Sequence, residues 1–129
     1  MSSRTLLIAV LVISFTAIGI AALAGERQLP GPLEAGWQGE PVCELLLEDE
    51  RQRMLRCTFP PGVGHERHYH KPHTGYTLVG GLMQITDANG TRVVDVKTGG
   101  YFVSDGVEWH EALNVGETTA QYLIIEIAD

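Results

Sequence analysis

Short runs of alternating apolar and polar residues fill most of this 129-residue chain, and clusters of turn-forming residues separate the runs. Alternation with a period of two predicts β-strands, because successive side chains on a strand point to opposite faces. Asn89-Gly90, which lies between two such runs, is a strong signal for a hairpin. The expected strands cover residues 42–47, 53–59, 76–79, 82–86, 92–96, 101–103, 107–113 and 120–127, together with a histidine-rich strand after Gly62. About nine short strands at this spacing predict an all-β sandwich or barrel.

The first residues follow another pattern. Residues 5–24 carry no charge, follow a single Arg4, and end on the small-residue sequence Ala22-Leu23-Ala24. These features make residues 1–24 a signal peptide, or else an uncleaved signal anchor, because an apolar run of this length can also span a bilayer as a transmembrane helix. Both alternatives predict an exported protein, periplasmic or extracellular, whose membrane contact is confined to an uncleaved N-terminal segment.

The remaining length is enough for one domain with one core. Residues 25–41 have little periodicity and include Pro30-Gly31-Pro32, which predicts a linker. The domain is therefore expected at residues 42–129. The whole chain has a formal net charge of −7 and no cluster of lysine and arginine residues. This composition argues against nucleic acid as a partner.

Two cysteines lie in the first expected hairpin. A turn at Glu48-Asp49-Glu50-Arg51 would bring Cys43 opposite Cys57. In an oxidising compartment such a pair can form a disulfide. Register read from sequence is easily wrong by one residue, so two small buried thiols that never meet remain the alternative.

Histidine has an uneven distribution in the chain. Four of the five histidines fall in the stretch from Gly62 to Tyr76, and the fifth is His110. His68 and His70 are two residues apart, so on a strand both imidazoles project from the same face. Imidazole is a common donor to zinc, iron, copper and nickel, and three converging rings could hold such an ion with coordination positions open.

These residues carry a family resemblance. Gly62, five further residues, His68-x-His70, and then Gly81 resemble the first sequence motif of the cupins. The resemblance continues in the second half of the chain and covers roughly residues 42–127.

Gly99 to Asn114, which includes His110, resembles the second cupin motif. The resemblance implies a small jelly-roll barrel, preceded here by the N-terminal apolar helix. It also implies a divalent metal ion bound by the histidines of the two motifs, which are His68, His70 and His110.

The chain departs from the cupin pattern at a ligand position. Cupins usually have a glutamate four or five residues after the second histidine, where this sequence has Thr74 and Gly75. The departure implies a three-histidine set, such as some cupin dioxygenases have, or a weak site; His73 or His65 could take the vacant place. Imidazole donors without a carboxylate favour Fe(II), Zn or Ni, with iron(II) the first choice for an enzyme.

Strand alternation also suggests residues beside the ligands. Counting from His110 places Glu108 on the same face, as an outer partner or general base, against the alternative of a solvated carboxylate. Tyr76 shares a face with Thr74 and is either a hydroxyl lining the cavity or a packed core aromatic. Glu108 and Tyr76 are therefore the candidate catalytic residues.

Two classes of function are compatible with these patterns. The first is a metal-dependent enzyme, dioxygenase-like or isomerase-like, acting on a small oxygen-containing molecule. The second is a non-catalytic module that binds or senses a metal or small ligand, since one fold hosts many functions. Exposed strand edges in small barrels also predict a homodimer.

Overall fold

The structure is a computed structural model that describes residues 28–128. The predicted signal peptide or anchor at residues 1–24 lies outside this range. Nothing in the described range forms a helix with the length and hydrophobicity that a membrane span needs. The strands are β1 (Gly36–Trp37), β2 (Glu40–Pro41), β3 (Cys43–Glu48), β4 (Gln52–Phe59), β5 (Gly64–His70), β6 (His73–Val79), β7 (Gly81–Asp87), β8 (Gly90–Val96), β9 (Tyr101–Ser104), β10 (Val107–Asn114) and β11 (Ala120–Ile127). The all-β prediction is confirmed for these residues.

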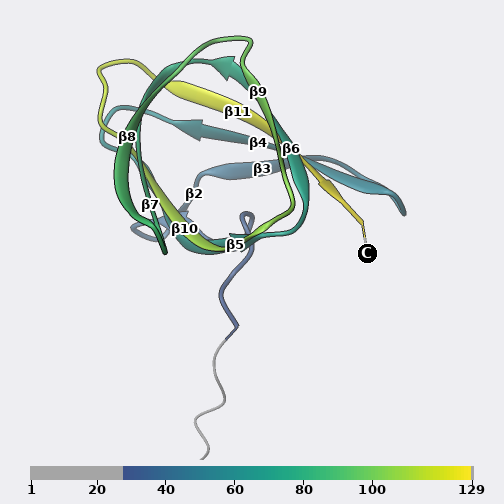
Figure 1. Cartoon of the computed structure of the whole chain (residues 1–129). Helices are drawn as coiled ribbons and strands as arrows, with labels where there is room; N and C mark the ends of the chain where they lie inside the picture. Colours follow the sequence, from purple (N-terminus) through teal and green to yellow (C-terminus); the bar gives the residue numbers. More distant parts are fainter. Residues whose placement is uncertain (1–27, 129) are drawn as a thin grey trace, which may run out of the picture.

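Two antiparallel sheets face each other and curl into a barrel (Figure 1). One sheet has the strand order β5-β10-β7-β8 and the other has the order β3-β4-β11-β6-β9. From β5 onward the chain passes repeatedly between the two sheets, so strands distant in sequence become neighbours. The pairing of β10 with β5 matters most for the site, because it brings the two histidine-bearing strands side by side.

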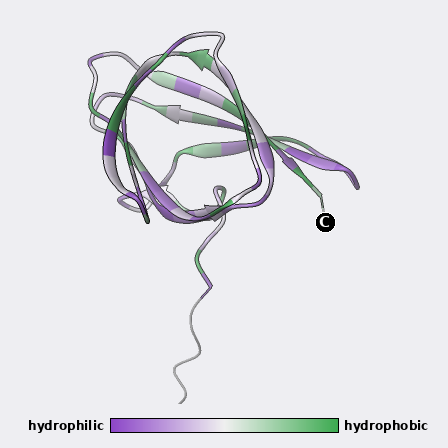
Figure 2. Ribbon diagram, viewed as in Figure 1, coloured by the Kyte–Doolittle hydropathy of each residue, from purple (hydrophilic) through white to green (hydrophobic). Residues whose placement is uncertain are grey.

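Alternation along the strands explains the core. In β4 the buried residues are Leu55, Cys57 and Phe59, each two positions from the next. Met83 of β7 and Ile124 of β11 pack against them from the two sheets. Figure 2 shows the corresponding mixture of apolar and polar residues along single strands. Each strand thus gives one face to the interior, and any polar residue on that face projects into the barrel.

Part of the segment expected to be a linker packs on the barrel. The carbonyl oxygen of Pro30 accepts a hydrogen bond from the amide of Tyr69 at 3.1 Å, and Ala35 is 4% exposed. A Cβ added at Gly64 would lie 2.7 Å from the ring of Trp37, so this glycine lets the segment approach β5. These contacts use backbone carbonyls and single side chains rather than a periodic apolar face, which is why the sequence pattern did not reveal them.

The two cysteines form a disulfide in the first hairpin. Cys43 of β3 pairs directly with Cys57 of β4, and their Cα atoms are 4.0 Å apart. Of the two alternatives left open by the sequence, the bridged one is present. It ties the edge strand β3 to the core residue Cys57, which is 3% exposed.

Removing this disulfide is expected to lower the free energy of unfolding by about 3 kcal/mol, because the unfolded chain regains the freedom of a loop of roughly fifteen residues. Urea denaturation of the wild type with and without reductant, and of Cys43→Ser/Cys57→Ser, measures the effect. The double variant serves as the control, since reductant should not change its midpoint. An unchanged midpoint in the reduced wild type would contradict the prediction.

Candidate metal centre

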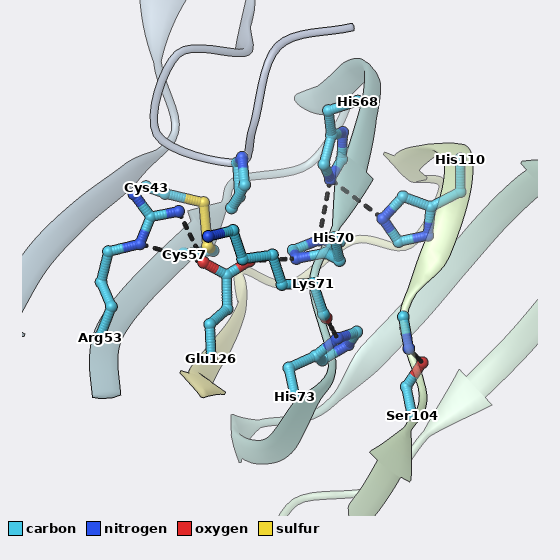
Figure 3. Close-up of polar contacts among 12 residues, drawn as sticks. Cys43, Arg53, Cys57, His68, His70, Lys71, His73, Ser104, His110 and Glu126 are labelled. Atoms are coloured by element: carbon cyan, nitrogen blue, oxygen red, sulfur yellow. Dashed lines mark hydrogen bonds and ion pairs between the residues drawn. A yellow bond between two sulfur atoms is a disulfide. The ribbon is translucent and has the colours of Figure 1, made fainter. Parts of the chain in front are cut away.

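Three imidazoles meet inside the barrel (Figure 3). His68 and His70 project from the inward face of β5, and His110 comes from β10, where it is the register partner of His68. The Nε2 atom of His68 lies 3.0 Å from Nε2 of His70 and 3.0 Å from Nε2 of His110. We call these residues the three-histidine set. Their ligand atoms all lie within 4.8 Å of one another.

The other ring nitrogens fix the tautomers of two of these rings. His68 donates its Nδ1–H to the carbonyl oxygen of Glu66 at 2.6 Å, and His70 donates its Nδ1–H to the Glu126 carboxylate at 3.1 Å. Both acceptors lack a proton to give, so Nδ1 must be the donor in each neutral ring. When both rings are neutral, as metal ligation requires, the two Nε2 atoms present lone pairs to each other at 3.0 Å. A metal ion between them would bind both lone pairs.

A divalent metal ion fits this arrangement. Imidazole nitrogens bind zinc at about 2.0–2.1 Å, so two such ligands are about 3.4 Å apart in the tetrahedral geometry of zinc and about 3.0 Å apart at the right angle of an octahedral ion. Both contacts that His68 makes in the set have the shorter separation. Metal-bound histidines also usually donate their second ring nitrogen to a carbonyl or carboxylate, as His68 and His70 do.

Burial keeps the rings of His68 and His110 neutral. Loss of solvent, reinforced by the neighbouring His65 and His110, lowers the pKa of His68 to about 2. The same loss of solvent, reinforced by His70 and His65, lowers the pKa of His110 to about 3. Because metal ligation needs the neutral imidazole, both rings are in the binding form at neutral pH.

We expect the stability of the metal-free protein to fall as the pH is lowered from about 6.5 towards about 4. Burial also lowers the pKa of His65 to about 4 and lowers the pKa of His73. Four histidines with lowered folded-state pKa values therefore contribute: His65, His68, His73 and His110. In the unfolded chain they protonate near the ordinary histidine pKa of about 6.5, so in this window the unfolded state binds more protons. Each group then lowers the free energy of unfolding by up to about 1.4 kcal/mol per pH unit, and above the unfolded pKa its contribution to stability is fully kept.

Urea midpoints measured between about pH 7 and 4 test this dependence. A matched variant, His110→Gln, removes one of the titrating groups. Its free energy of unfolding should therefore depend less steeply on pH, by the equivalent of up to one bound proton. A midpoint that stays constant across the window would contradict the prediction.

A buried carboxylate that sequence reasoning missed supports His70. Glu126 of β11 has a side chain that is 2% exposed, and its second oxygen accepts two hydrogen bonds from Arg53, at 2.6 and 3.0 Å. Burial alone would raise its pKa, but the hydrogen bonds from His70 and Arg53 hold the pKa of Glu126 below its usual value. The available signal was a lone charge within the apolar sequence Ile124-Ile125-Glu126-Ile127.

The three-histidine set opens into a cavity of about 400 Å³, which we call the histidine cavity. The remaining two histidines, His65 and His73, also line it. His65 bonds through Nε2 to the carbonyl of Pro32 at 3.0 Å, and His73 donates Nδ1–H to the carbonyl of Lys71 at 2.7 Å. Most of the remaining wall is apolar and includes Phe59, Met83, Ile85, Val94, Val96 and Ile124.

Neither predicted catalytic residue lines this cavity. Glu108 is exposed, and Val107 lines the cavity in its place, because the β5–β10 ladder has a register shift between Val107 and His110. Such a shift moves side chains to the opposite face relative to simple alternation. Tyr76 does share a face with Thr74, but that face points outward, and Tyr76 is 42% exposed.

Phe102 fills the space beside Gly75, one of the two positions where the resemblance predicted a glutamate. Gly75 lies on the inward face of β6, and a Cβ added there would be 2.3 Å from the Phe102 ring. Phe102 comes from the neighbouring strand β9, where it is the register partner of Gly75. Its ring stands perpendicular to that of His73, with centroids 5.7 Å apart. An aromatic edge therefore lies where a side chain at position 75 would begin.

Comparison with known proteins agrees with this geometry. The family model described as Cupin domain matches residues 55–126, which is more than half of the chain. No curated protein matches. A cupin domain from Bordetella pertussis Tohama I is similar in structure, with a TM-score of 0.65 and 19% identity, over 80% of this chain and 99% of that one.

Two further structures show the same fold at low identity. A predicted oxalate decarboxylase from Thermotoga maritima has a TM-score of 0.53 and 23% identity, over 67% of this chain and 79% of its own. The polyketide cyclase RemF from Streptomyces resistomycificus has a TM-score of 0.54 and 19% identity, over 75% of each chain. At these identities the similarity concerns the jelly-roll fold alone.

Proposed function

This chain belongs to the cupin family, and from that premise we propose that it is an exported protein that binds a metal ion and a small oxygen-containing molecule. The ion is a first-row divalent metal, iron(II), zinc or nickel, held by the three-histidine set. The observation that carries the proposal is the convergence of three ring nitrogens: Nε2 of His68 lies 3.0 Å from Nε2 of His70 and 3.0 Å from Nε2 of His110. A single cation placed among them would bind all three neutral rings.

The surrounding residues prepare the site for the ion. Glu66 and Glu126 orient the rings of His68 and His70 through their Nδ1–H groups. Arg53 forms an ion pair with the Glu126 carboxylate, so the residues that orient His70 add little net charge to the barrel. When bound, the metal supplies a Lewis acid for an oxygen donor, and iron would also supply redox chemistry.

In the enzymatic version of this proposal, dioxygenase-like or isomerase-like, His73 replaces Glu108 as the candidate base. His73 lines the histidine cavity and is 4% exposed. Its Nδ1–H is committed to the Lys71 carbonyl, which leaves the lone pair on Nε2. Burial lowers the pKa of His73, which favours the neutral ring with its free lone pair but makes it a weaker base than an exposed histidine.

The alternative is a non-catalytic binding module. One observation favours it: among the described residues, no aspartate or glutamate lines the histidine cavity. Tyr122, another lining residue, has its pKa raised to about 12 by burial, so it is a hydrogen-bond donor rather than a base. Proton transfer in the cavity would therefore depend on histidine alone.

Metal analysis of the purified protein tests the proposal. Metal-free protein titrated with zinc, nickel or anaerobic iron(II) is expected to take up one ion per chain. Absence of uptake would overturn it.

The Cys43–Cys57 disulfide supports export, because disulfides persist in oxidising compartments. N-terminal sequencing of the mature protein, with Gly25 expected first, tests that part separately.

A further inference from the structure

Arg92 is an unusual residue for the wall of the histidine cavity. It lies on the inward face of β8, two residues before Val94 and four before Val96, and all three side chains line the cavity. Among the described lining residues, Arg92 is the only one with a permanent charge. An arginine on an otherwise apolar strand face points to a ligand with a complementary group.

The guanidinium of Arg92 is placed near the third ligand of the set. Its Nη1–H donates to the Asp87 carboxylate at 2.7 Å, and Asp87 is the register partner of His110. The Arg92 side chain is 53% exposed, so it stands at the mouth of the cavity. A guanidinium has five N–H donors, and within residues 28–128 this contact with Asp87 occupies one nitrogen.

The charges around the set leave the ion without a counterion. The three ligands are neutral imidazoles, so a divalent ion keeps its full charge. Glu126 is paired with Arg53, and Asp87 is paired with Arg92, so each pair is neutral overall. A charge of this size beside an apolar wall is unfavourable without an anion.

We propose that the histidine cavity binds an amphiphilic carboxylate, an inference that rests on the metal site proposed above. The carboxylate end lies toward the three-histidine set and Arg92, where an arginine fork can donate two parallel hydrogen bonds. The hydrocarbon body lies against the apolar wall formed by residues such as Phe59, Met83 and Ile85. A cavity of about 400 Å³ suits a small molecule of this kind.

The test compares octanoate with its neutral analogue octanamide by calorimetry on the zinc-loaded protein. Octanoate is expected to bind at least about tenfold more tightly, because charge-assisted hydrogen bonds exceed neutral ones by this order. Arg92→Met should reduce that preference, leaving the part that comes from the charge of the zinc ion, and should leave the zinc stoichiometry unchanged. Arg92→Lys keeps the charge without the fork and should be intermediate; it replaces the methionine variant if circular dichroism shows that variant unfolded.

Arg56→Met is the matched control, because Arg56 is also a half-exposed arginine with an acidic partner, Glu44, but does not line the cavity. It should bind octanoate as the wild type does. Equal binding of octanoate and octanamide, or an undiminished preference in Arg92→Met, would overturn the inference even if zinc binds. If zinc does not bind, the metal proposal fails, whereas a preference for octanoate that depends on Arg92 in the metal-free protein would still support the carboxylate site.

Discussion

Replacing His68 with alanine is expected to weaken binding of zinc or iron(II) by more than about a hundredfold. Even the loss of a residue that only hydrogen-bonds to a metal ligand lowers metal affinity by about 10–100-fold. His68 is the central member of the set, because both close Nε2 contacts include it. The remaining pair, His70 and His110, provides only two donors. Competition with a chromophoric chelator measures the affinity, and inductively coupled plasma analysis measures the metal content after dialysis.

His73→Ala is the control for this experiment. His73 resembles His68 in burial and in donating Nδ1–H to a carbonyl two residues earlier in the chain. It lies outside the three-histidine set, so its loss should change metal affinity far less. Equal losses in the two variants would show that general damage to the cavity, and not ligation by His68, determines affinity. Unchanged metal content in His68→Ala would refute the site.

Replacing Glu126 with glutamine is expected to lower the free energy of unfolding of the metal-free protein by about 3–5 kcal/mol. The glutamine oxygen can still accept the Nδ1–H of His70, but the amide nitrogen then faces the Arg53 guanidinium. Arg53 has a side chain that is only 24% exposed, so solvent cannot fully replace the lost carboxylate. Metal affinity should also fall by about 10–100-fold, because the hydrogen bond that orients the His70 ring becomes weaker.

A surface pair provides the comparison for Glu126. Glu111 forms a salt bridge with Arg67 at 2.9 Å, and the two side chains are 42% and 51% exposed. Glu111→Gln should cost at most about 1 kcal/mol, as is usual for exposed ion pairs. Urea denaturation of both variants gives the two values. If Glu126→Gln is as stable as Glu111→Gln, the buried carboxylate does not support the barrel in the way proposed here.

The shared face of His68 and His70 could be predicted because it depends on regular strand geometry. His68 and His70 share a strand face by simple alternation, and the family resemblance supplied His110. The first hairpin was also predictable, since its two runs flank a charged turn and place Cys43 opposite Cys57. In these places the local sequence pattern agrees with the tertiary structure, so a single sequence is enough to predict the arrangement.

The errors lie where the ladder is irregular. Alternation from His110 put Glu108 in the cavity, but the register shift next to Val107 reverses the faces. Another shift on the same ladder, where His110 and Ala112 pair with His68 and His65, brings His65 inward although it is three residues from His68. Bulges of this kind have no reliable signature in one sequence.

Glu126 was missed for a different reason. Its role depends on Arg53 and His70, which are 73 and 56 residues away along the chain. Spacing within a motif cannot report such partners. A lone carboxylate on the inward face of an apolar strand was the local sign, because burying it requires partners of opposite charge or with hydrogen-bond donors.

The point where the described chain enters the barrel has a consequence for attachment. Gln28, Leu29 and Pro30 line a second cavity, which also contains Arg53 and Glu126 and lies on the outer side of the carboxylate that supports His70. The histidine cavity, by contrast, has Arg92 and Phe102 among its lining residues and none of residues 28–35. The described chain therefore reaches the barrel beside Arg53 and Glu126, and not beside Arg92. Molecules would still exchange through the mouth at Arg92, so a tethered form of the domain should load and release ligand as the free form does.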